Sequence, residues 1–165
     1  MNYVIYGQEP LLMEQRLNQL KNKYHINEED MNMMTYWCNE TNMSVIIEDA
    51  LTPPFLSEYK MIVIKNPYFL TTMKQKDVTE DDINLFLGYI VQDNPTTIFV
   101  VYHDQKNFDE RKKVVKTLRK NAKCYDISKP DYQDLYRMAA KAIDERNCHI
   151  DEDALNLFLS RMNAD

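Results

Sequence analysis

The sequence predicts an α/β protein in which a parallel five-stranded sheet carries helices on both faces and a small helical unit follows. Short apolar runs, the pattern of strands covered on both faces, alternate with amphipathic segments of helical period. A chain of 165 residues with 44% hydrophobic residues can bury a core in one domain plus a small appendage. The strand pattern stops at Ser128–Pro130. We therefore expect a sheet unit over residues 1–128 and a helical unit over 129–165.

The first half of the sheet unit contains three predicted strands. The first spans residues 3–6. Gly7 to Pro10 then form the connection to a helix, and Pro10 suits the first turn of that helix. That helix continues to about residues 25–27, because apolar side chains recur along it at helical spacing, namely Met13, Leu17, Leu20 and Tyr24. A second strand is predicted at 33–37, and a short helix runs from about Ser44 to Leu51 before Pro53 stops it. The third strand, at 61–64, is an unbroken β-branched run that should lie inside the sheet.

The second half repeats the alternation. Thr79 precedes three acidic residues, which predicts an N-terminal cap, and apolar residues follow at helical spacing: Ile83, Phe86, Leu87, Ile90 and Val91. A fourth strand at 97–102, a helix from Asp109 to about Asn121 and a fifth strand at 123–127 complete a doubly wound sheet with right-handed crossovers. Beyond Pro130 we expect two amphipathic helices and no further strand.

The turn before the third strand is unusual. Pro53 and Pro54 disfavour a helix and donate no backbone hydrogen bonds, yet two large apolar residues, Phe55 and Leu56, follow at once. Such a pair either folds back onto the core as a plug or is held out as an apolar surface for a partner. Composition alone leaves both interpretations open.

The turn after the first strand begins like a phosphate-binding loop, G-x-x-x-x-G-K-[ST], and then departs from it. Counting from Gly7, Leu12 stands in place of the second glycine, Met13 in place of the lysine and Glu14 in place of the hydroxyl residue. The third strand ends in Lys65 and Asn66, where a magnesium-binding acid would be needed. We therefore expect the scaffold of a nucleotide hydrolase without a nucleotide, a cofactor or catalytic residues of its own.

Charge is unevenly distributed along the chain. The net charge is −6, yet residues 106–123 contain eight Lys or Arg and two acidic residues, a local charge of +6. Such a face can contact nucleic-acid phosphates or simply be solvated, and only one aromatic residue, Phe108, interrupts it. The candidate DNA contacts are Lys112, Lys113, Lys116, Arg119 and Lys120.

Several classes of protein are disfavoured. Three widely spaced cysteines predict buried thiols rather than disulfides, and together with three scattered histidines they suggest no metal site. No apolar stretch approaches the roughly 20 residues of a membrane helix, and the N-terminus lacks the pattern of a signal peptide. We therefore expect a cytoplasmic protein.

Three stretches together resemble the delta subunit family of the bacterial DNA polymerase III clamp loader: Tyr3–Leu12, Leu51–Pro67 and the helix pair after Pro130. The resemblance implies a degenerate AAA+-like fold of the P-loop NTPase type that has lost ATP binding. A helical lid domain would start at about residue 129, and a collar domain would follow Asp165. Catalysis would then belong to the DNA polymerase III holoenzyme and not to this subunit.

The resemblance also implies partners and a site. The partners would be the sliding clamp, which is the beta subunit of the holoenzyme, the other clamp-loader subunits, and primed DNA within the complex. In delta subunits the turn before the third strand inserts apolar residues into a pocket of the ring-shaped clamp and opens the ring. Here that element would be Thr52, Pro53, Pro54, Phe55 and Leu56. The alternatives are a basic module that binds nucleic acid and a divergent phosphotransferase.

Overall fold

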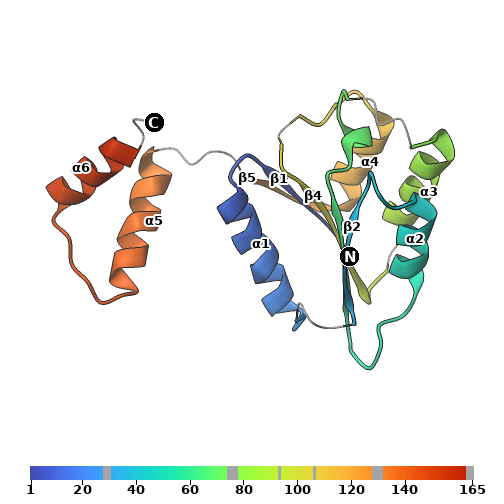
Figure 1. Cartoon of the computed structure of the whole chain (residues 1–165), viewed down its shortest axis with the longest axis horizontal. Helices are drawn as coiled ribbons and strands as arrows, with labels where there is room; N and C mark the ends of the chain where they lie inside the picture. The colour runs from blue at the N-terminus through green and yellow to red at the C-terminus, as the bar shows by residue number, and fades with distance from the viewer. Residues whose placement is uncertain (28–30, 74–77, 93, 106, 128–131, 163–165) are drawn as a thin grey trace. The chain divides into compact units, whose positions relative to one another are not determined.

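The computed structural model describes residues 1–27, 31–73, 78–92, 94–105, 107–127 and 132–162. The chain divides into two compact units, Met1–Ser128 and Lys129–Asp165. Figure 1 shows the elements of each unit.

The first unit is built on a five-stranded parallel sheet of order β2-β3-β4-β1-β5. Its strands are β1 (Asn2–Gly7), β2 (Met33–Trp37), β3 (Lys60–Lys65), β4 (Thr97–His103) and β5 (Lys123–Ile127). All five predicted strands are therefore present. β3 lies between β2 and β4, and its residues Met61 to Ile64 are fully buried, as expected of an interior strand covered on both faces.

Helices cover both faces of the sheet. Figure 1 shows α1 (Pro10–Lys23) on one face and α2 (Met43–Leu51), α3 (Glu80–Ile90) and α4 (Lys113–Asn121) on the other. Met13, Leu17 and Leu20 of α1 pack on side chains of β1, β3 and β4. The opposite core is larger and joins α2, α3 and α4 to the other side of the same strands. The predicted parallel α/β fold with helices on both faces is confirmed.

Most helix boundaries agree with the prediction. α1 ends at Lys23, slightly before the expected residues 25–27. Thr79 caps α3 as predicted: its hydroxyl accepts the Asp82 N–H, while the Asp82 side chain accepts the Thr79 N–H. A short 3₁₀ helix, η1 (Tyr68–Leu70), follows β3 and was not predicted.

The predicted start of α4 was wrong. The helix begins at Lys113, and Asp109 lies in the turn before it. The Asp109 carboxylate accepts the Arg111 N–H and forms an ion pair with the Arg111 guanidinium, whose hydrogen bonds lower the Asp109 pKa to about 2. The Asp109 N–H donates to Leu70 O, which fixes this turn against η1. Asp109 therefore closes a turn with Arg111 instead of capping a helix.

The second unit contains α5 (Tyr132–Asp144) and α6 (Glu152–Met162). Leu155 and Leu159 of α6 are buried, and the Tyr132 hydroxyl donates to Asn156 Oδ1 at 2.7 Å. The apolar side chains of α5 are at most half-buried. Two helices thus bury few side chains between them.

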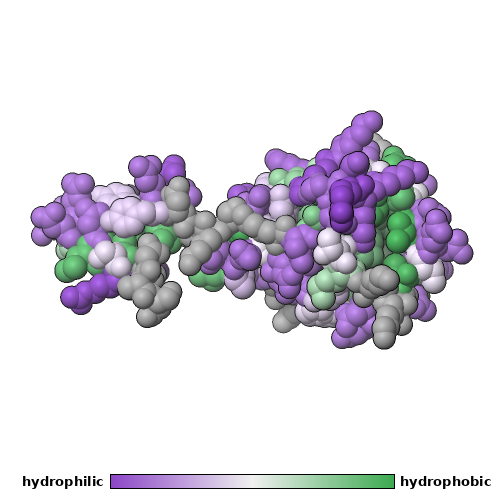
Figure 2. Space-filling view, turned by 90° about the horizontal axis from the view of Figure 1, so that it is seen from above, coloured by the Kyte–Doolittle hydropathy of each residue, from purple (hydrophilic) through white to green (hydrophobic). Residues whose placement is uncertain are grey.

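Hydrophilic residues cover most of the face of the first unit seen in Figure 2, and hydrophobic residues reach that face in a narrow band. In the described parts of the chain, no helix combines the length and the apolar character that crossing a bilayer requires.

Candidate functional site

The turn between α2 and β3 projects two apolar side chains into solvent. Phe55 is 59% exposed and Leu56 is 91% exposed. A plug on the core would bury both, so that interpretation is wrong. Leu56 also adopts a left-handed conformation, with φ of +50°, which is uncommon for a branched side chain and marks a turn whose shape is imposed by its surroundings.

The proline pair ends α2 and starts the turn. Thr52 is the last residue to donate its N–H into α2, to Glu48 O and Asp49 O. Its φ of −69° and ψ of 133° are the extended values that a following proline favours. The chain therefore leaves the helix sharply, and Phe55 lies only three residues beyond it.

A partly buried ion pair fixes the two ends of the turn. Lys60, the first residue of β3, donates from Nζ to Asp49 Oδ1 at 2.6 Å and to Asp49 O at 2.7 Å, near the end of α2. The Tyr36 hydroxyl donates to the other carboxylate oxygen of Asp49 at 2.9 Å. Burial, and then this hydrogen bond, raise the pKa of Tyr36 to about 12. The last turn of α2 is thus attached to both β2 and β3.

The tip of the turn is attached to the start of β2. The buried side chain of Asn32 accepts the Phe55 N–H at 2.6 Å and donates to Phe55 O at 2.8 Å. Sequence reasoning missed Asn32. Nothing in the local pattern around a polar residue before a strand indicates a partner 23 positions away.

The degenerate loop after β1 leads directly into α1. Leu12, Met13 and Glu14 all lie inside α1, and Met13 is fully buried in the core. Glu14 pairs with Lys21 at 3.7 Å.

Part of the backbone of this short loop is bonded to β5. The Gln8 N–H donates to Ile127 O of β5, and Pro10 has no N–H to offer. A Cβ added to Gly7 would lie 1.9 Å from Ile127 O, so this glycine allows β5 to approach β1. The motif positions of the loop therefore supply no lysine for a phosphate, and one of its N–H groups is used to bind β5.

The end of β3 carries a cation where a magnesium ligand would be needed. The Lys65 ammonium lies 5.4 Å from the ring centre of Trp37 and 5.2 Å from that of Tyr102, on the neighbouring strands. The Asn66 amide donates to Asp104 Oδ2 at 3.3 Å. This arrangement packs the ends of three strands together and favours a structural role over phosphoryl transfer.

Two of the five candidate DNA contacts are engaged inside the protein. Lys112 donates from Nζ to Phe69 O at 2.9 Å and to Thr71 O at 2.6 Å. Arg119 pairs with Glu110 at 2.6 Å and lies over the rings of Tyr6 and Phe108. Lys113, Lys116 and Lys120 are exposed, and their spacing places them along one side of α4.

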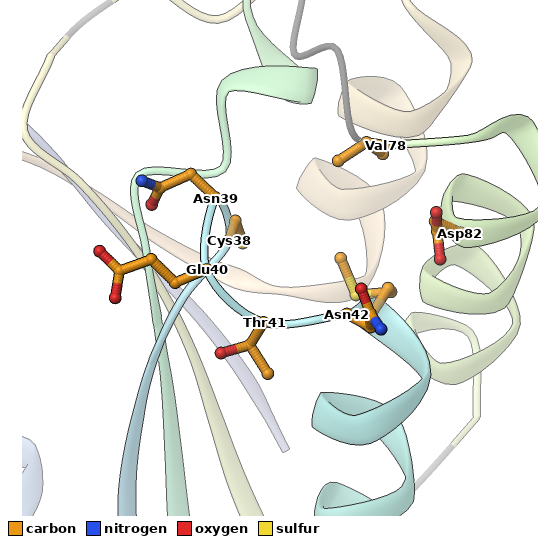
Figure 3. Close-up of a pocket in the computed structure, with 8 residues that line it drawn as sticks. Cys38, Asn39, Glu40, Thr41, Asn42, Val78 and Asp82 are labelled. Carbon is orange, nitrogen blue, oxygen red and sulfur yellow. The ribbon is translucent and has the colours of Figure 1, made fainter.

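A pocket of about 100 Å³ lies where β2 leads into α2 and is lined in part by Val78, just before α3, and by Asp82 in the first turn of α3. Figure 3 shows Glu40 and Asp82 on opposite sides of it, and the Asp82 carboxylate is already bonded to Thr79. Burial raises the pKa of the Cys38 thiol in its wall to about 12, which keeps the thiol protonated and unreactive. One of the two carboxylates of the pocket is thus engaged in the cap of α3, and its buried thiol is not an activated nucleophile.

The cysteines follow the prediction only in part. Cys38 is buried, Cys124 is half-buried, and Cys148 is exposed, so the expectation of buried thiols was wrong for Cys148. Among the described residues, no group of three or more His, Cys, Asp or Glu side chains could hold a metal ion.

Comparison with known proteins agrees with these observations. The family model for the DNA polymerase III delta subunit matches residues 3–128. The DNA polymerase III subunit delta of Bacillus subtilis (strain 168) is 34% identical over 121 residues, which are 73% of this chain and 35% of the relative. This chain therefore spans about a third of that relative's length.

Solved structures lead to the same family. The structure of the Bacillus subtilis DNA clamp loader delta protein matches with a TM-score of 0.79 and 27% identity, covering 94% of this chain and 46% of that one. A DNA polymerase III gamma subunit-related protein of Thermotoga maritima matches with a TM-score of 0.54 and 12% identity, covering 88% of this chain and 47% of that one, a likeness of fold alone. On the match over residues 3–128, the chain belongs to the DNA polymerase III delta subunit family.

Proposed function

We propose that this chain binds the sliding clamp through Thr52, Pro53, Pro54, Phe55 and Leu56 and opens the ring during DNA replication. The observation that carries the proposal is the exposure of Phe55 and Leu56 on a turn whose ends and tip are both fixed. An apolar pair kept in solvent by a rigid scaffold suits insertion into an apolar pocket, because docking removes the pair from water while little conformational entropy is lost.

The proposed activity needs no ATP hydrolysis by this chain. Its degenerate loop and the cation at the end of β3 support a role in which other clamp-loader subunits use the nucleotide. The second unit would correspond to the beginning of the helical lid, and primed DNA would meet the subunit within the assembled complex.

The test measures clamp affinity and ring opening separately. Leu56→Ala should weaken binding to a bacterial sliding clamp by roughly tenfold, because a buried apolar anchor commonly contributes more than 1 kcal/mol. It should also slow the release of clamps from nicked circular DNA by this chain. Leu11→Ala is the matched control, because Leu11 is 72% exposed on α1, away from the turn. Equal effects of the two variants would contradict the proposal.

The exposed lysines of α4 support a second candidate function, direct contact with DNA phosphates. Lys113, Lys116 and Lys120 present three charges on one side of a helix and make no ion pair that would neutralise them in the described structure. Binding of short primed DNA should then fall steeply as salt rises. No binding even at low salt would remove this candidate.

A further inference from the structure

We propose that Asn32 is a positioning residue for clamp docking, which fixes the backbone of Phe55 so that the apolar pair is presented in its binding conformation. This inference rests on the proposed function and extends the docking element to a residue outside the 52–56 turn.

The geometry is a closed pair of hydrogen bonds. Asn32 Oδ1 accepts the Phe55 N–H at 2.6 Å, and Asn32 Nδ2 donates to Phe55 O at 2.8 Å. One side-chain amide thus satisfies both backbone polar groups of the residue that carries the exposed ring. Among side chains of this size only asparagine offers an acceptor and a donor in the required arrangement, since aspartate lacks the donor and leucine lacks both.

Asn32 is itself held by the sheet. Its side chain is buried, with the residue 3% exposed, and its carbonyl accepts the Met61 N–H of β3 at 2.7 Å. It directly precedes β2, whose residues pair in register with β3 from Met33 onward. The amide therefore connects the hydrogen-bonded edge of β2 and β3 to a segment that has no regular secondary structure.

Fold stability alone does not require this contact. Phe55 is more than half exposed, so water could satisfy its backbone groups if Asn32 were absent. The ion pair between Lys60 and Asp49 already fixes the ends of the turn. The two Asn32 bonds instead restrict its tip, where Leu56 adopts the left-handed conformation that a free chain would rarely populate.

The consequence is a population effect. When only a fraction of molecules holds the docking conformation, the apparent dissociation constant rises by the inverse of that fraction. Releasing two hydrogen bonds from a turn of five residues should reduce that fraction to about a tenth, since each bond favours the closed state by roughly threefold.

The first measurement does not depend on the clamp. In Asn32→Leu, which keeps the side-chain size and removes both bonds, hydrogen exchange of the Phe55 amide should become at least roughly threefold faster. Asn32→Ala also removes both bonds and takes the place of Asn32→Leu if that variant folds poorly. In Asn32→Asp the acceptor remains, so the Phe55 N–H bond is retained and exchange of that amide should change less. Unchanged exchange of the Phe55 amide in Asn32→Leu would overturn the inference.

The second measurement is a double-mutant cycle on clamp affinity. Asn32→Leu should weaken clamp binding by about tenfold in the wild-type background and by a similar factor when Phe55 is already alanine, because its bonds are to the backbone of residue 55 and Leu56 still docks. A change of less than about twofold in the wild-type background would overturn the inference. Asn66→Ala is the control, because Asn66 follows the end of β3 that lies away from the turn and its side chain donates to Asp104. This variant should lower the melting temperature without changing clamp affinity.

The cycle also separates this inference from the proposed function. If Phe55→Ala binds the clamp as tightly as the wild type, the proposed function fails, and the docking role of Asn32 fails with it. If Phe55→Ala binds weakly and Asn32→Leu binds normally, the proposed function stands and only the role of Asn32 is overturned.

Discussion

Truncating Phe55 to alanine separates a residue exposed for binding from one buried for stability. An aromatic side chain offers about 150–250 Å² of surface, and Phe55 keeps 59% of its exposure in the folded chain. Roughly 80 Å² of the Phe55 side chain is therefore covered in the folded protein. At 25 cal/mol per Å², this burial stabilises the fold by about 2 kcal/mol as an upper limit. Because the unfolded chain also covers part of this area and alanine keeps some of it, we expect a loss of about 1 kcal/mol.

The comparison is Phe86→Ala, because Phe86 is fully buried between α3 and the sheet. A buried phenylalanine of this kind should cost roughly 3–5 kcal/mol. For a unit of this size, we expect the melting temperature to fall by about 3 °C for Phe55→Ala and by roughly 10 °C or more for Phe86→Ala.

Clamp affinity should show the opposite order. Loss of an aromatic anchor worth about 2 kcal/mol weakens binding by about 30-fold. The folded fraction of Phe86→Ala should bind almost normally, and so should Phe158→Ala, which removes a ring of similar exposure from α6. The reasoning is refuted if Phe55→Ala is as destabilising as Phe86→Ala while its folded fraction binds the clamp with wild-type affinity.

Three further outcomes are expected. Calorimetry with ATP and magnesium should show no binding, because Met13 and Glu14 lie inside α1 where a phosphate site would need a cation and a hydroxyl; a micromolar dissociation constant would contradict this. Changing Lys113, Lys116 and Lys120 together to glutamine should reduce the salt dependence of any DNA binding, with little change in melting temperature. Lys112→Gln, by contrast, should lower the melting temperature, because its bonds to Phe69 O and Thr71 O are lost. Burial raises the pKa of Cys38 from 9.0 to about 12, so its contribution to stability is complete below about pH 9 and is lost as the pH rises towards 12. The free energy of unfolding of Cys38→Ala should therefore fall less steeply with pH over that range. Alkylation at about pH 8 should label exposed Cys148 and leave Cys38 unlabelled.

The sheet could be predicted because its signal is local. Each interior strand is a short run of apolar residues, and Met61 to Ile64 need no distant partner to be recognised as covered on both faces. The cap at Thr79 is local as well, since its partner Asp82 lies three residues away. The start of α4 was mistaken because Asp109 has two possible local partners, the amides of a helix and the side chain of Arg111, and contact with η1 favours the second.

The candidate site could be predicted only in part. The residues of the turn were identified, but composition could not decide between plug and exposed surface, because burial depends on the shape of the whole unit. Asn32 was missed because its bonds to Phe55 join segments brought together only by the pairing of β2 with β3. In the basic segment, the bond of Lys112 to η1 likewise depends on tertiary structure. A count of charges along the sequence therefore cannot distinguish this lysine from its exposed neighbours.

Gly7 shows that one residue of a sequence motif can be required for a reason unrelated to phosphate binding. With a Cβ only 1.9 Å from Ile127 O, any other residue here would force β5 away from β1 and break the bond from the Gln8 amide. The requirement for glycine at this position thus comes from a neighbouring strand, whether or not a phosphate is ever present. A glycine that ends the first strand of such a sheet is therefore poor grounds for assigning nucleotide binding, and the residues five to seven positions later are the ones that discriminate.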